Sequence, residues 1–162
     1  MSLQIGQPAP EFKLFNTEKK EIALSDLRGK NVVIHFFPQA FTGTCTTQLC
    51  TMRDNYNWYT SLNAEVIGIS VDSLFTLAAY KKDQNYQFDL LSDFNKTVAP
   101  QYDSFMEEFA FGMKGVSKRS AFVIDKDGMI RYAEVCEKVT DLPNFEAIKA
   151  CLQSLNNLAA GA

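Results

Sequence analysis

Two apolar segments, each followed by a stretch of helical pattern, limit the fold of this chain more than any other feature. The first, "NVVIHFFP" (31–38), ends at a proline, and the second is "AEVIGISVD" (64–72). Continuous apolar runs of this length, rich in β-branched residues, are typical of strands buried on both faces of a sheet. Residues 42–62 carry apolar side chains at helical spacing, and Ser73 opens a second predicted helix that runs to about Tyr86.

Shorter elements complete the predicted α/β pattern. They are an edge strand in 6–15, strands at 21–24 and 88–91, a short helix in "NKTVAPQY" (95–102), a hairpin over 120–137 that turns at "DKDG", and an amphipathic helix over 143–158. Strands that alternate with helices, followed by a late antiparallel hairpin, favour an α/β domain with a mixed central β-sheet flanked by helices. A chain of 162 residues fits a single domain, 1–162.

Charge and hydropathy exclude several classes of protein. A formal net charge of −3 gives no reason to expect nucleic acid or an anionic membrane as partner. No stretch approaches the run of about 18 apolar residues that a membrane span needs. The first residues, "MSLQIGQPAPEF", do not combine a basic region with an apolar core, so no signal peptide is expected and the cytoplasm is the predicted location.

The cysteines are the candidate reactive groups. The chain has four, Cys45, Cys50, Cys136 and Cys151, and a single histidine, His35. In a reducing compartment such a set indicates one reactive thiol or a transient disulfide, with the remaining thiols buried. No C-x-x-C pair is present, so neither a zinc site nor another metal site is expected. His35, inside an apolar strand, is interpreted as a core histidine rather than a catalytic base.

Cys45 falls in the first turn of the predicted helix 42–62. The free N–H groups and the positive dipole end of a helix favour a thiolate over a thiol at this position, as a nucleophilic cysteine requires. Either Thr42 or Thr44 can cap the helix. Thr42 can also place its hydroxyl against the sulfur, and Pro38 can shield the sulfur from water. The alternative interpretation is an ordinary helix start with a buried structural cysteine.

The spacing Pro38-x-x-x-Thr42-x-x-Cys45 after an apolar strand resembles the active-site signature of the peroxiredoxins. Three flanking segments, "IGQPAPEFKLFN", "LSDLRGKNVVIHFFP" and "GVSKRSAFVIDKDGMIRY", resemble the same family in the same order. The short length of the chain and the segment "FFPQAFTGTC" are most similar to the small bacterial AhpE-like and bacterioferritin-comigratory-protein-like branches. The resemblance implies a thioredoxin-like fold.

The resemblance also implies reduction of hydrogen peroxide and alkyl hydroperoxides without a cofactor. Cys45 would attack the peroxide and become a sulfenic acid. Thr42 would hydrogen-bond the sulfur and the substrate, Pro38 would shield them, and Arg119 would place a positive charge beside the sulfur. Supporting roles would fall to the backbone around Thr44 and to the side chain of Gln48. Electrons would come from a thioredoxin-like or low-molecular-weight thiol reductant, and the protein would form a homodimer through loops around the site.

The spacing between Cys45 and Cys50 leaves two interpretations of Cys50 open. In the bacterioferritin-comigratory branch a cysteine five residues after the first resolves the sulfenic acid as an intramolecular disulfide. On an intact helix, however, residues five apart have Cα atoms about 8–9 Å apart, beyond the limit of about 7 Å for a disulfide, so the helix must unwind. Otherwise Cys50 is a small core residue and an external thiol resolves Cys45. Cys136 and Cys151 are weaker candidates for the resolving role.

Two other functions fit the same fold. A dithiol–disulfide oxidoreductase would need two cysteines at C-x-x-C, whereas the spacing here is C-x-x-x-x-C. A non-enzymatic redox sensor would use Cys45 only as a signal. Turnover of peroxide with a reductant separates both from a thiol peroxidase.

Overall fold

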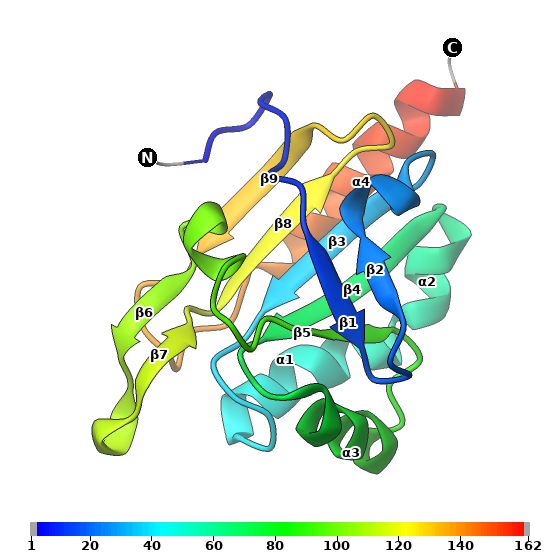
Figure 1. Ribbon diagram of the computed structural model, residues 1–162. Coiled ribbons are helices and arrows are strands. Elements are labelled where there is room, and N and C mark those ends of the chain that lie inside the picture. The colour runs from blue at the N-terminus through cyan, green and yellow to red at the C-terminus, as the bar shows by residue number, and fades with distance from the viewer. Residues whose placement is uncertain (1–2, 161–162) are drawn as a thin grey trace.

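The computed structural model describes residues 3–160, and within these residues the chain forms a seven-stranded sheet in the order β2-β1-β5-β4-β3-β8-β9 (Figure 1). The strands are β1 (Lys13–Asn16), β2 (Glu21–Ala23), β3 (Asn31–Phe36), β4 (Ala64–Ser70), β5 (Asp89–Ser92), β8 (Ser120–Ile124) and β9 (Ile130–Val135). The helices are α1 (Gly43–Asp54), α2 (Tyr56–Ser61), α3 (Leu74–Gln84) and α4 (Phe145–Ala160), with 3-10 turns η1 (Leu24–Leu27), η2 (Ala99–Tyr102) and η3 (Ala110–Gly112). The predicted mixed central sheet is confirmed.

The centre of the sheet is parallel and its two edges are antiparallel. Strand β4 pairs in parallel with β3 on one side and with β5 on the other. Strand β8 pairs antiparallel with β3, and β9 with β8, as predicted for the late hairpin. Helix α1 starts beyond the carboxyl end of β3, where open α/β sheets place their functional sites.

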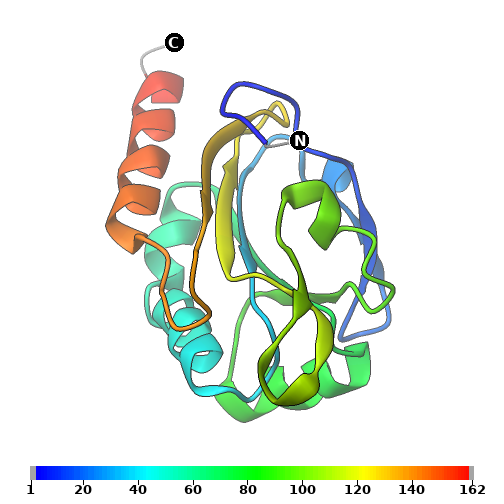
Figure 2. The ribbon, with the colours of Figure 1, turned by 90° about the vertical axis from the view of Figure 1, so that its left-hand side faces the viewer.

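The side chains of β3 and of Phe37, the residue after it, alternate between two apolar clusters. Val33 and Phe37 face the cluster to which the helices contribute, including Leu49 of α1, Leu77 of α3 and Ile148 of α4. Val32, Ile34 and Phe36 face the opposite cluster, which is completed by the N-terminal segment and by η1 and η2. Figure 2 shows α1, α2 and α4 together on one side of the sheet. Burial on both faces explains why β3 reads as a continuous apolar run.

The predicted helix 42–62 is interrupted at Asn55, which corrects that prediction. Asn55 has φ −110° and ψ 12°, and α2 starts at the next residue. Its side-chain amide donates to the Thr51 carbonyl at 2.8 Å, while its backbone N–H donates to Met52. The asparagine side chain thus satisfies the carbonyl that the backbone would bond in a continuous helix.

Two further differences concern the edges of the fold. The segment 6–15, predicted to lead into an edge strand, forms a strand only at Lys13–Asn16, because Pro8 and Pro10 lack the N–H that a ladder needs. The edge position was wrong, since β1 pairs with β2 on one side and with β5 on the other. A second hairpin, β6 (Phe105–Glu108) with β7 (Lys114–Ser117), was not predicted, since "FMEEFAFGMKG" lacks clear alternation. This hairpin projects from the body of the protein (Figure 1). Within residues 3–160, no helix has the length and apolar character needed to cross a bilayer.

Candidate active site

Cys45 lies in the first turn of α1, with a side chain that is fully buried. The loop before the helix is fixed to the end of β4. The Ala40 N–H donates to the Asp72 carboxylate at 2.8 Å, and Ser70 donates to the same carboxylate at 2.7 Å. Phe41 then adopts a positive φ of 66°, which turns the chain into α1. The sulfur therefore sits on a helix start whose preceding loop is anchored to the end of β4 by these hydrogen bonds.

Thr42 occupies the N-cap position of α1, as predicted, but it does not cap the helix with its side chain. Its hydroxyl donates to the Gln39 carbonyl at 2.8 Å. The lone pairs of the hydroxyl oxygen stay available to accept a hydrogen bond, for example from the O–H of a bound molecule. Pro38 is buried at the end of β3, and Thr44 is partly exposed in the first turn of α1.

The Arg119 guanidinium reaches Cys45 from the loop that joins β7 to β8. Its Nη1 donates to the sulfur at 3.2 Å and to Gln48 Oε1 at 2.8 Å. On the other side, Nε and Nη2 both donate to the Val139 carbonyl, at 3.1 and 2.7 Å. Only 3% of Arg119 is exposed, so its charge acts on the sulfur with little screening by water.

Direct contacts thus join Cys45, Arg119 and Gln48, three residues that the sequence analysis assigned to one site. A positive charge and the N-terminus of α1 meet at the sulfur, and both stabilise negative charge there. The contribution of Val139 was not predicted. It acts through its backbone carbonyl, so its side-chain type carries no signal in the sequence.

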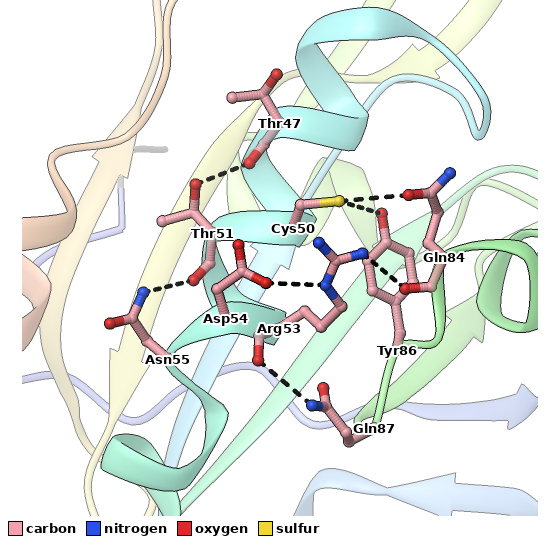
Figure 3. A network of polar contacts seen from close by, with 9 residues as sticks. All are labelled: Thr47, Cys50, Thr51, Arg53, Asp54, Asn55, Gln84, Tyr86 and Gln87. Atoms are coloured by element: carbon pink, nitrogen blue, oxygen red, sulfur yellow. Dashed lines mark hydrogen bonds and ion pairs between the residues drawn. The ribbon is translucent and has the colours of Figure 1, made fainter.

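Cys50 lies on the same helix but faces a different neighbourhood (Figure 3). Its thiol contacts Gln84 Oε1 at 3.5 Å and the Tyr86 hydroxyl at 3.7 Å. Arg53 donates to the Gln84 carbonyl at 2.8 Å, which ties this half of α1 to the end of α3. Cys45 and Cys50 are both free thiols, and α1 is intact between them. On an intact helix, residues five apart are too far from each other to form a disulfide.

The other two thiols lie elsewhere on the chain. The Cys136 N–H donates to the Arg119 carbonyl at 2.9 Å, so Cys136 is a cross-strand neighbour of the candidate site. Burial, reinforced by Glu134, raises the pKa of its thiol to about 11. Burial also raises the pKa of Cys151, on α4. Both groups are therefore weak nucleophiles at neutral pH.

Known proteins with similar sequences place the chain in a family. Residues 5–133 match the family described as AhpC/TSA. The chain belongs to the AhpC/TSA family. Among its relatives in this family, a putative peroxiredoxin bcp of Haemophilus influenzae is 39% identical over 155 residues, which cover 94% of this chain and 98% of that protein. Peroxiredoxin Bcp of Bacillus subtilis is 35% identical over 131 residues, covering 80% and 83% of the two chains.

Two solved structures are similar to this chain over most of its length. Peroxidoxin BcpB from Mycobacterium tuberculosis is 28% identical and superposes with a TM-score of 0.80 over 96% of this chain and 97% of that one. The reduced 2-Cys peroxiredoxin of Plasmodium vivax is 25% identical, with a TM-score of 0.82 over 96% and 83%. The thioredoxin-like fold predicted from the sequence is confirmed, and the protein is a thiol peroxidase of the peroxiredoxin type.

Proposed function

We propose that Cys45 is the residue that reduces hydrogen peroxide and alkyl hydroperoxides in this peroxiredoxin. The contact of 3.2 Å between Arg119 Nη1 and the Cys45 sulfur carries the assignment. A guanidinium in this position stabilises the thiolate, and it can also donate to the peroxide oxygens as charge develops on them. Thr42, with its hydrogen given to Gln39, would accept a hydrogen bond from the peroxide O–H. Pro38 would exclude water, and the amides near Thr44 would add donors.

The proposed reaction is a two-electron transfer. The thiolate of Cys45 attacks one peroxide oxygen, the S–O bond forms and the O–O bond breaks. Cysteine is oxidised to sulfenic acid, while the peroxide is reduced to an alkoxide or hydroxide that takes up a proton. Buried Cys45 needs a path for the peroxide, and movement of the loop before α1 would open one.

Cys50 is the proposed resolving thiol. Its sulfur would attack the sulfenic sulfur, forming an S–S bond and releasing hydroxide, which becomes water on protonation. To do so it must leave Gln84 and Tyr86, and α1 must unwind between the two cysteines, because an intact helix keeps them too far apart. A thioredoxin-type reductant would then restore both thiols. An external thiol that attacks Cys45 directly is the alternative to Cys50.

Cysteine variants assayed with a thioredoxin reducing system test this assignment. Cys45→Ser is expected to lose peroxide turnover to the background level, because serine offers no thiolate. Cys50→Ser should still form the sulfenic acid at Cys45 but no intramolecular disulfide. Cys151→Ser is the matched control, with wild-type turnover and disulfide. A disulfide that persists in Cys50→Ser would mean that Cys136 or Cys151 resolves the sulfenic acid. A wild-type protein that is oxidised once at Cys45 but does not turn over peroxide would favour a redox sensor.

A homodimer and a cytoplasmic location are also proposed. Exposed aromatic side chains support the dimer: Phe41 before α1, Phe94 after β5 and Phe111 in the turn of the β6–β7 hairpin are 54, 63 and 97% exposed. Exposed apolar groups of this size favour association of two copies. Light scattering over a concentration series is expected to give twice the monomer mass, and a constant monomer mass would contradict the proposal.

A further inference from the structure

His35 is a buried polar residue that the reaction proposed above does not use. It lies in β3 among Val33, Ile34 and Phe36, its side chain is fully buried, and its ring stacks on Phe145 of α4. Nε2 has no hydrogen-bond partner among the described residues. An unsatisfied N–H in a core costs free energy that an apolar residue would avoid. The other ring nitrogen, Nδ1, lies 2.9 Å from Gln48 Nε2.

The protonation state of His35 follows from its surroundings. Burial lowers the pKa of the imidazole to about 3, so the ring is neutral at physiological pH. Gln48 presents its NH₂ group to Nδ1, so Nδ1 must be the acceptor and the ring proton must be on Nε2. With Gln48 in this orientation, His35 Nδ1 accepts a hydrogen bond from its amide.

The orientation of the Gln48 amide depends on its partners on both sides. Arg119 has only donors, so Gln48 must turn Oε1 toward it. Its NH₂ group then needs acceptors, and it finds His35 Nδ1 at 2.9 Å and the Phe36 carbonyl at the longer distance of 3.3 Å. An amide can be rotated by 180° in its pocket, and the acceptors at His35 Nδ1 and at the Phe36 carbonyl both favour the orientation suited to Arg119, the shorter contact being that to Nδ1.

Gln48 in turn directs Arg119 at the sulfur. Arg119 Nη1 carries two hydrogens, one for Gln48 Oε1 and one for Cys45. The opposite side of the guanidinium is held by the Val139 carbonyl. With both sides fixed, the remaining Nη1–H points at the sulfur. A flipped Gln48 would present NH₂ to the guanidinium, and the two donor groups would repel each other.

We propose that His35 is a positioning residue for peroxide reduction, which acts through Gln48 to hold the Arg119 guanidinium against Cys45. The proposal rests on the assignment of Cys45 as the reacting residue. His35 takes no proton and does not touch the substrate in this role. The hydrogen-bond relay of His35, Gln48 and Arg119 preorganises the charge that the transition state needs.

A double-mutant cycle tests this relay. The second-order rate constant for oxidation of Cys45 by hydrogen peroxide is measured by quenched-flow mass spectrometry in wild type, His35→Leu, Gln48→Leu and the double variant. His35→Leu is expected to lower the rate constant about five- to tenfold, roughly the effect of one hydrogen bond. In the Gln48→Leu background the same change should have no further effect, because the relay is already broken.

Rescue and a second readout separate positioning from a merely structural role. In His35→Asn, the side-chain oxygen takes the place of Nδ1 as acceptor and should restore most of the lost rate, whatever the stability of the variant. Alkylation of Cys45 by iodoacetamide at pH 7 should be slower in His35→Leu than in wild type, and its rate should return toward wild type in His35→Asn. Phe145→Leu, which removes the ring that stacks on His35 but leaves the relay intact, is the matched control.

The outcomes also separate this inference from the assignment of the site. An equal fall in rate for His35→Leu with and without Gln48, or no rescue by asparagine, would overturn the positioning role while leaving Cys45 as the reacting residue. Unchanged rates in His35→Leu would overturn it as well. Peroxide turnover that survives in Cys45→Ser would instead overturn the assignment of the site.

Discussion

Replacing Arg119 by methionine is expected to lower the rate constant for oxidation of Cys45 by peroxide by about 10²- to 10³-fold. Loss of one preorganised donor to a developing charge typically costs about 3–4 kcal/mol in the transition state. Arg119 supplies such a donor to the sulfur at 3.2 Å, from a site that is almost closed to water. Methionine fills much of the same volume, so the change removes the charge and the hydrogen bonds without opening a large cavity.

Two further variants isolate the role of the guanidinium. Arg119→Lys is expected to recover only part of the rate, because an ammonium group cannot contact Cys45, Gln48 and Val139 in the planar geometry that Arg119 uses. Lys118→Met removes the neighbouring positive charge and should leave the rate within about twofold of wild type. Stopped-flow or quenched-flow kinetics at pH 7 give all three values. Wild-type kinetics in Arg119→Met would contradict the role assigned to the guanidinium.

The free energy of unfolding is expected to fall by about 2 kcal/mol between pH 7 and pH 5 because of His35 alone. Burial lowers the pKa of His35 from its ordinary value of 6.5 to about 3. Below pH 6.5 the unfolded chain takes up a proton at this residue and the folded protein does not, so acid favours unfolding. The contribution of neutral His35 to the free energy of unfolding is thus fully present above pH 6.5, and it is lost as the pH falls toward 3.

The single histidine of the chain makes this effect easy to assign. Urea denaturation at pH 7, 6 and 5, with reductant present, gives the free energy of unfolding of the wild type and of His35→Leu. The variant should lack most of the decrease in this window, in which the carboxyl groups with a lowered pKa, Asp125 and Glu11, stay ionised. A decrease of the same size in both proteins would show that His35 is not the titrating group.

Much of the fold could be predicted from the sequence because the local pattern of apolar residues matches the burial of each element in the structure. Strands β3 and β4 are buried on both faces and read as continuous apolar runs, and Ser73 caps α3 by accepting from the Thr76 N–H at 3.2 Å. The break between α1 and α2 was missed, because a single asparagine at a helical position is not a strong stop signal. The β6–β7 hairpin was missed because its strands are partly exposed and irregular.

The candidate site also contains residues that could be predicted from the sequence and residues that could not. Cys45, Gln48 and Arg119 meet through their side chains, and the resemblance to peroxiredoxins named all three as candidates. Val139 acts through a backbone carbonyl, so no pattern of side chains could identify it. His35 was interpreted as a core histidine. Its burial bears this out, but its contact with Gln48 depends on the packing of α1 against β3, which local sequence does not specify.

Whether Cys45 is the residue that reacts with peroxide is tested first by mapping the oxidised residue after one turnover. Reduced protein is mixed with one equivalent of hydrogen peroxide and a sulfenic-acid trap, then analysed by intact mass and peptide mapping. Oxidation is expected at Cys45, as a trapped sulfenic acid or as a disulfide with Cys50. Rapid consumption of peroxide with Cys45 recovered as an unmodified thiol would contradict it.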